Sequence, residues 1–287
     1  MPVCDSAGAR TLDPLIKSQL LYQLSYEIFC WGANIALHSQ IDQSFFNKLQ
    51  FISVSLHPYW KLMKKIAVIV AGGSGQRMGV STPKQFLLLK NKPLLWHTIQ
   101  AFLQAFNDIQ LVVVLPHEHL VFGKEIADSF PIANIHTTTG GVTRFHSVKN
   151  GLMLLDTTDA IIFVHDGVRC LLTPDLIKRC YEQALTKGSA IPAVAATDSI
   201  RIATVDENSI VADRTKVRII QTPQTFQAAL LLPAFHQEYQ DSFTDEATVA
   251  EAFGNKVCLI EGEYNNLKIT RPIDLLVAEK ILEERGF

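Results

Sequence analysis

The segment Ile66–Gln85 constrains the fold of this chain more than any other, because a strand-like run leads into a glycine-rich turn with cations close behind. Its first residues, Ile66–Val70, are apolar and mostly β-branched, as in a buried strand. The glycines follow at once, and Arg77 and Lys84 come after them. Backbone that can be approached closely, together with fixed cations, is what a nucleoside triphosphate requires. The segment therefore predicts a phosphate-binding loop at the end of a strand.

Two common phosphate loops do not fit this spacing. In the dinucleotide fingerprint, G-x-G-x-x-G, Gly73 and Gly75 would be the first two glycines, but Met78 stands in the place of the third. That fingerprint also needs an acidic residue further along, and residues 80–107 contain no Asp or Glu. A P-loop is excluded because no glycine pair has the required spacing before a lysine. A plain connecting turn is the third interpretation, and the two cations at fixed distances argue against it.

Composition narrows the class of protein. The chain has 287 residues, of which 48% are hydrophobic, enough for one large α/β domain or two small ones. A net charge of −2 gives no basic field for a nucleic acid, and no apolar run is long enough to span a membrane. The five cysteines are odd in number and include no C-x-x-C, which predicts free thiols in a reducing cytoplasm. We interpret His117 and His119 as surface residues rather than metal ligands.

The chain divides at Met63, where a regular pattern of strands and helices begins. Residues 1–62 lack the basic and apolar regions of a signal peptide, and Arg10 is their one arginine, which argues against a transit peptide. Three interpretations stay open. Met63 is the true start of translation, which we favour; or the segment is a disordered or lightly helical extension; or residues 20–31 form an amphipathic helix that binds a partner.

From residue 63 to 287 the alternation predicts an α/β fold with a Rossmann-like mixed, mostly parallel sheet flanked by helices. Residues 197–218 break the rhythm, because they are polar and β-like, and they predict a projecting hairpin. Thr173 and Thr244 are the expected caps of two helices. The expected strands are 66–70, 111–115, 161–165, 190–194 and 257–260, and the expected helices are 94–105, 118–128, 144–155, 174–186, 227–236, 246–252 and 272–284.

Two further motifs carry candidate chemistry. Gly140 and Gly141 lead into a helix that carries Arg144 and Ser147, where backbone groups and a hydroxyl could read a base edge; a helix start with a surface arginine is the plainer alternative. Asp166 ends a buried strand, which is where open α/β sheets bind ligands, and a carboxylate there can hold Mg²⁺ together with substrate phosphates. The alternative is that Asp166 only caps the following turn.

The run from Ala71 to Phe86 resembles the nucleotidyltransferases that activate sugar and polyol phosphates. Among them it is most similar to the 2-C-methyl-D-erythritol 4-phosphate cytidylyltransferase family of the non-mevalonate isoprenoid pathway. Six separated motifs between Lys64 and Phe287 match that family in order. Departures from the common pattern stand at Val142, Gly167, Val168, Cys170, Asn265 and Leu267.

The resemblance implies transfer of CMP from CTP to 2-C-methyl-D-erythritol 4-phosphate, with Mg²⁺ and with release of pyrophosphate. It implies a homodimer in which the 197–218 arm completes the neighbour's site. Arg77 and Lys84 are the expected catalytic residues, with Asp166 at the metal and the nucleotide. The expected nucleotide-binding residues also include Ala71, Gly72, Gly73, Gly75, Gly141 and Ser147, and the acceptor is expected to be positioned by Arg169, Ser199, Arg214, Thr222, Thr244 and Lys268.

Other functions stay open at this point. A ribitol-5-phosphate cytidylyltransferase would share the loop and the dimer and differ in the acceptor pocket. An enzyme of the same fold could prefer UTP or GTP. A non-catalytic nucleotide-binding module is the alternative from another class, although such a module need not keep both loop cations and the carboxylate at Asp166.

Overall fold

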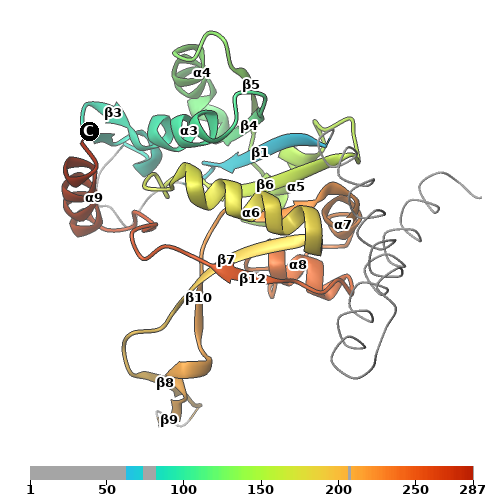
Figure 1. The fold of residues 1–287 in the computed structure, drawn as a ribbon, viewed down its shortest axis with the longest axis vertical. Helices are drawn as coiled ribbons and strands as arrows, with labels where there is room; N and C mark the ends of the chain where they lie inside the picture. The colour runs from blue at the N-terminus through green and yellow to red at the C-terminus, as the bar shows by residue number, and fades with distance from the viewer. Residues whose placement is uncertain (1–62, 74–81, 206–207, 287) are drawn as a thin grey trace, which may run out of the picture. The chain divides into compact units, whose positions relative to one another are not determined.

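The computed structural model describes residues 63–73, 82–205 and 208–286. The expectations for residues 1–62, and those for Gly75 and Arg77, lie outside these ranges. The described chain builds a mixed, mostly parallel sheet with helices on both faces, which confirms the predicted fold class (Figure 1). Among the described residues no helix has both the length and the apolar character needed to cross a membrane.

Four parallel strands form one half of the main sheet, in the order β6-β1-β4-β5. The chain runs from β1 outward to β4 and β5 and then returns to the other side of β1 as β6. Such a reversal of strand order leaves a crevice at the carboxyl ends of the two central strands, where ligands of open α/β sheets bind. Their bounds are β1 Lys64–Val70, β4 Gln110–Leu115, β5 Asn134–Thr139 and β6 Ala160–Asp166.

The other half of the main sheet is mixed. Strand β11 (Gln224–Gln227) lies antiparallel between β6 and β7 (Ser189–Ala195). Strand β10 (Arg218–Ile220) pairs antiparallel with β7, and β12 (Leu259–Glu261) pairs parallel with it. Two small hairpins stand outside this sheet: β2 (Leu88–Leu89) with β3 (Lys92–Pro93), and β8 (Ile200–Ala203) with β9 (Ser209–Ala212). The β8–β9 hairpin extends away from the main sheet, as predicted for residues 197–218 (Figure 1).

The helices agree closely with expectation. Three expected helices, 94–105, 246–252 and 272–284, have the predicted bounds, whereas the one expected over 144–155 ends at Leu152. Thr173 caps its helix as predicted, because its side chain accepts a hydrogen bond from Leu176 N–H. The α-helices are α3 Leu94–Ala105, α4 Leu120–Asp128, α5 Arg144–Leu152, α6 Pro174–Lys187, α7 Ala228–Ala234, α8 Glu246–Ala252 and α9 Pro272–Glu284, and 3₁₀ turns occupy η2 Lys84–Phe86, η3 His117–His119 and η4 Arg214–Lys216.

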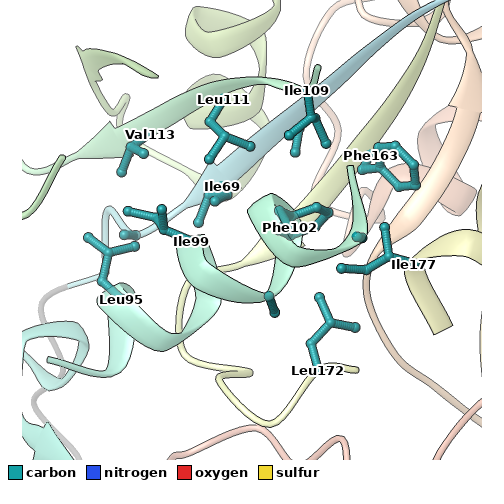
Figure 2. Packing of buried hydrophobic residues seen from close by; sticks show 14 of the residues in the cluster. Ile69, Leu95, Ile99, Phe102, Ile109, Leu111, Val113, Phe163, Leu172 and Ile177 are labelled. Atoms are coloured by element: carbon teal, nitrogen blue, oxygen red, sulfur yellow. The ribbon is translucent and has the colours of Figure 1, made fainter. Parts of the chain in front are cut away.

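The core has two layers because alternate strand residues point to opposite faces of the sheet. In β1, Ile69 packs with α3 residues such as Ile99 and Phe102, whereas Val68 packs on the other face with Val148 of α5. Figure 2 shows the first layer, in which side chains of α3 meet those of β1, β4 and β6. Covering both faces explains why β1, β4 and β6 read as continuous apolar runs in the sequence. The rigid sheet holds the ends of β1 and β6 side by side, with Val70 opposite Asp166.

Candidate active site

The end of β1 is held by two hydrogen bonds. Ala71 N–H donates to Val114 O at 2.8 Å, and the buried side chain of Gln85 donates to Ala71 O at 2.7 Å. Gln85 belongs to η2, so this bond returns the chain to the start of the loop and keeps Lys84 next to an anchored residue. Phe86 is buried as well and packs edge-on against Phe122. The arrangement fixes both ends of the predicted phosphate loop.

The expected base-reading residues lie against this loop. Gly141 N–H donates to Ser147 Oγ at 3.0 Å, and Ser147 Oγ donates to Thr143 O at 3.0 Å. Ser147 lies close to both glycines: a Cβ on Gly140 would lie 3.0 Å from Ser147 Oγ, tight enough that the serine would have to shift, and one on Gly72 would make an ordinary contact at 3.5 Å. The backbone at Gly72, the backbone at Gly140 and Gly141, and the hydroxyl of Ser147 therefore lie close together at one edge of the sheet.

Asp166 lies at the end of β6 and is the centre of a charged cluster. Its carboxylate is 2.8 Å from Lys268 Nζ, 3.3 Å from Arg144 Nε and 3.7 Å from Arg169 Nε. Burial alone would raise the pKa of Asp166, but these three cations outweigh it and hold the pKa well below its usual range. The carboxylate is thus ionised at neutral pH. Its oxygens bind cations, so Asp166 is more than the cap of a turn.

Arg144 has a larger role in the structure than the sequence indicated. Its terminal nitrogens donate to both carboxylate oxygens of Glu246, one bond being 3.0 Å long, while its Nε faces Asp166. Glu246 is 1% exposed, and burial raises its pKa against the opposing influence of Arg144. The arginine expected at most as a base reader or a surface residue is therefore the link between two carboxylates.

A buried histidine orders the other side of Asp166. His165 Nε2 lies 3.2 Å from Arg169 O, and its Nδ1 lies 2.9 Å from Thr222 Oγ1. Because a carbonyl only accepts, Nε2 carries the proton and Nδ1 accepts from the Thr222 hydroxyl. That hydroxyl also accepts from Asp166 N–H at 3.1 Å. The network fixes Thr222, an expected substrate-positioning residue, from inside the protein.

Replacing His165 tests this network through the pH dependence of stability. Burial lowers the pKa of His165 from 6.5 to about 3, so below pH 6.5 the unfolded chain binds a proton that the native protein refuses. The free energy of unfolding therefore falls as pH drops from 6.5 toward 3, by ~1.4 kcal/mol per pH unit for this one group. His165→Asn keeps an acceptor near Nδ1 and is expected to flatten that slope in urea titrations at several pH values. An unchanged slope would contradict a buried neutral histidine.

Arg169 and Lys268 meet Asp166 from two different segments. Arg169 donates to Asn266 O at 2.8 Å, and Asn266 Nδ2 donates to Thr222 O at 2.8 Å. Lys268 lies outside the strands of the sheet, in a segment held by the bond from Ile269 N–H to Val168 O. Asn266 is fully buried, and that explains why this segment keeps its position without a sheet partner.

Three expected acceptor residues are outside the cluster. Ser199 and Arg214 are exposed on the arm, and Arg214 donates to Thr197 O at 2.8 Å, which ties the two legs of the arm together. Thr244 is exposed just before α8. The prediction that Thr244 caps that helix is wrong. Asp245 is the cap, because its carboxylate accepts a hydrogen bond from Thr248 N–H at 2.9 Å.

The cluster thus unites most predicted residues and adds some that the sequence did not single out. Ala71, Gly72, Gly141, Ser147, Asp166, Arg169, Thr222 and Lys268 lie around the ends of β1 and β6. Arg144, Glu246, His165 and Gln85 are the additions. One signal could have found Glu246: a carboxylate in an otherwise apolar helix face, with Ala247, Val249 and Ala250 beside it, demands a buried cation.

Comparison with known proteins gives the same answer as the residues. A family model described as "IspD: 2-C-methyl-D-erythritol 4-phosphate cytidylyltransferase" matches residues 65–284. A protein of that name from Bacteroides thetaiotaomicron is 43% identical over 221 residues, covering 77% of this chain and 100% of its own. The protein of the same name from Phocaeicola vulgatus is 41% identical with the same coverage.

A solved structure agrees. The crystal structure of 4-diphosphocytidyl-2C-methyl-D-erythritol synthase from Anaerococcus prevotii superposes with a TM-score of 0.67 at 26% identity, covering 77% of this chain and 99% of the other. The family match spans the glycine loop, the Asp166 cluster and the arm alike. This chain therefore belongs to the 2-C-methyl-D-erythritol 4-phosphate cytidylyltransferase family.

Proposed function

We propose that this chain transfers CMP from CTP to 2-C-methyl-D-erythritol 4-phosphate, giving 4-diphosphocytidyl-2-C-methyl-D-erythritol and pyrophosphate for isoprenoid precursor synthesis. One observation carries the proposal: an ionised carboxylate and three cations converge at the carboxyl ends of β1 and β6, beside the start of the glycine loop. Two anionic substrates must be held together there against their mutual repulsion. A cluster rich in arginine and lysine suits that task.

The chemistry is an in-line displacement. A phosphate oxygen of the acceptor forms a bond to the α-phosphorus of CTP, the bond to the bridging oxygen breaks, and pyrophosphate leaves with that electron pair. No protein nucleophile is needed, because the acceptor phosphate is already anionic. Catalysis then consists of positioning and of stabilising charge on the α-phosphoryl group. We assign that stabilisation to Arg77 and Lys84, and the holding of the two anions to Lys268 and Arg214.

Mg²⁺ is the proposed cofactor, with Asp166 as its protein ligand. Among residues 63–73, 82–205 and 208–286 no cluster of three or more His, Cys, Asp or Glu side chains could hold a metal ion. One ionised carboxylate still fits magnesium, which commonly binds one or two carboxylates plus substrate phosphates. The residues therefore suit an ion that arrives with the triphosphate, where it would supply positive charge to the phosphate oxygens.

The arm is the proposed dimer element. Its hairpin exposes four apolar side chains, Ile202, Val205, Ile210 and Val211, an unusual number for so small an element facing water. A second copy of the chain would cover them, and Ser199 and Arg214 would then complete the neighbour's acceptor site. Sedimentation equilibrium checks this proposal: a dimer mass that falls to the monomer on Val211→Asp supports it, whereas a monomeric wild type contradicts it.

We further propose that residues 63–287 are the catalytic domain, because the family match covers 65–284. Cytoplasmic location is the matching expectation. It is supported by the free thiols of Cys170 and Cys180, whose pKa burial raises to about 12, and by the free thiol of Cys258.

Pyrophosphate release by the purified protein tests the function. The assay contains Mg²⁺, CTP and one acceptor, either 2-C-methyl-D-erythritol 4-phosphate or ribitol 5-phosphate, and UTP or GTP replaces CTP in parallel samples. Release with CTP and the first acceptor alone is the expected result. Release with ribitol 5-phosphate would show that the proposed acceptor is wrong, and release with UTP or GTP would show that the proposed nucleotide donor is wrong. Nucleotide binding without any release would favour a binding module.

A further inference from the structure

Glu246 is a buried carboxylate that has no direct role in the proposed displacement reaction. It opens α8 with 1% of its side chain exposed, and it faces Arg144 at the start of α5. A buried ion pair is seldom explained by stability alone, because a protein with apolar residues of similar volume in its place is often equally stable or more stable. The pair therefore calls for a reason beyond holding the two helices together.

The geometry of the pair supplies one. Both terminal nitrogens of Arg144 donate to Glu246, which fixes the plane of the guanidinium group. The remaining nitrogen, Nε, then points at Asp166 Oδ1 at 3.3 Å. Glu246 thus decides where Arg144 can lie relative to the carboxylate at the centre of the cluster.

The same carboxylate holds the beginning of α8 in place. A second anchor acts there, because Gln224 donates to Asp245 Oδ2 at 2.8 Å and accepts from Ala247 N–H at 2.8 Å. Gln224 is itself buried, at 1% exposure. The residue just before this clamped turn is Thr244, an expected contact of the acceptor. The start of α8 is therefore fixed to β11 through Gln224 and to α5 through Glu246.

We infer that Glu246 is a positioning residue that couples the two halves of the site: it aligns Arg144 beside Asp166 on the nucleotide side and fixes Thr244 on the acceptor side. This inference rests on the proposed function. Because one ion pair serves both halves, its loss should weaken the use of both substrates. Loss of an ordinary packing contact would affect stability first.

The test separates positioning from packing with a pair of apolar replacements. In Arg144→Met/Glu246→Leu, two buried charges disappear together, so the midpoint of urea unfolding should stay near the wild-type value. We expect kcat/KM for both CTP and the acceptor to remain about 100-fold below wild type, since small misplacements in such sites have effects of this size. Glu246→Gln should show the same loss of kcat/KM with lower stability. Glu251→Gln, on the exposed side of the same helix, is the matched control and should behave as wild type.

Recovery by charge gives a second readout. Glu246→Asp keeps the carboxylate and should recover part of the kcat/KM that Glu246→Gln loses, with KM for both substrates moving back toward wild type. A double apolar variant that is both stable and fully active would overturn the inference and leave the proposed function intact. A folded wild type that releases no pyrophosphate would overturn the proposed function and this inference with it.

Discussion

Lys84→Ala is expected to lower kcat for cytidylyl transfer by about 10²–10³-fold, the usual effect of removing one group that stabilises developing charge. Lys84 begins η2, and its neighbour Gln85 is bonded to Ala71 at the start of the glycine loop. The lysine is therefore carried by a fixed element and not by a free surface segment. Such a loss corresponds to ~3–4 kcal/mol of activation free energy.

Steady-state pyrophosphate release at saturating CTP and acceptor measures this effect. Lys92→Ala is the matched control, because Lys92 lies a few residues further along and its ammonium group packs over the ring of Trp96 at 5.2 Å. We expect Lys92→Ala to keep wild-type kcat, and Lys84→Ala to keep the wild-type midpoint of thermal unfolding. A Lys84→Ala enzyme with near-normal kcat would rule out the assigned role of this residue.

Asp166→Asn is expected to lower kcat by about 10²–10³-fold without raising KM for CTP. The amide has the same shape as the carboxylate but no charge, so the proposed magnesium ligand is lost. Arg144, Arg169 and Lys268 then face the triphosphate without a competing anion. The binding of CTP should stay as tight or become tighter while turnover falls. This separation of kcat from KM distinguishes Asp166 from a residue that only binds substrate.

The same variant has a signature in stability. The pKa of Asp166 is held well below 3.8 by its cations, so when pH falls below about 4 the unfolded chain takes up a proton that the native protein does not. The wild type loses this part of its free energy of unfolding as the pH falls, whereas Asp166→Asn lacks this contribution at every pH. Urea titrations at pH 3 to 7 should show a shallower acid limb for the variant. Asp159→Asn, exposed near the start of β6, serves as the control. A variant with the wild-type acid limb and wild-type kcat would contradict both roles.

The sequence was informative where the chemistry is local. The apolar run of β1, the glycines after it and the carboxylate at the end of β6 define their own positions, because a strand end and a tight turn need little help from distant residues. Helix bounds followed from caps and apolar spacing. Strands β5 and β11 escaped prediction, since Asn134–Thr139 and Gln224–Gln227 are short and polar, and their strand character comes from the neighbours they pair with.

The sequence predicted which residues belong to the site better than it predicted how they are arranged in space. Asp166, Arg169 and Lys268 were all expected. Arg169 is only three residues from Asp166, but Lys268 reaches the same carboxylate because the chain returns to this edge of the sheet after β12. The ion pair between Arg144 and Glu246 joins residues 102 positions apart. Nothing in the local pattern around either residue indicates the other, and long-range pairs of this kind are set by the tertiary structure.

The place of β11 has a consequence for how the protein is made. Strands β6 and β7 follow each other along the chain with α6 between them, yet in the sheet β11 lies between the two. A nascent chain that has left the ribosome as far as β7 therefore holds two strands whose edges have no partner, until the arm has been translated and residues 224–227 can insert. Such exposed edges attract other strands. Synthesis that pauses within the arm should thus be the step at which this chain depends most on chaperones.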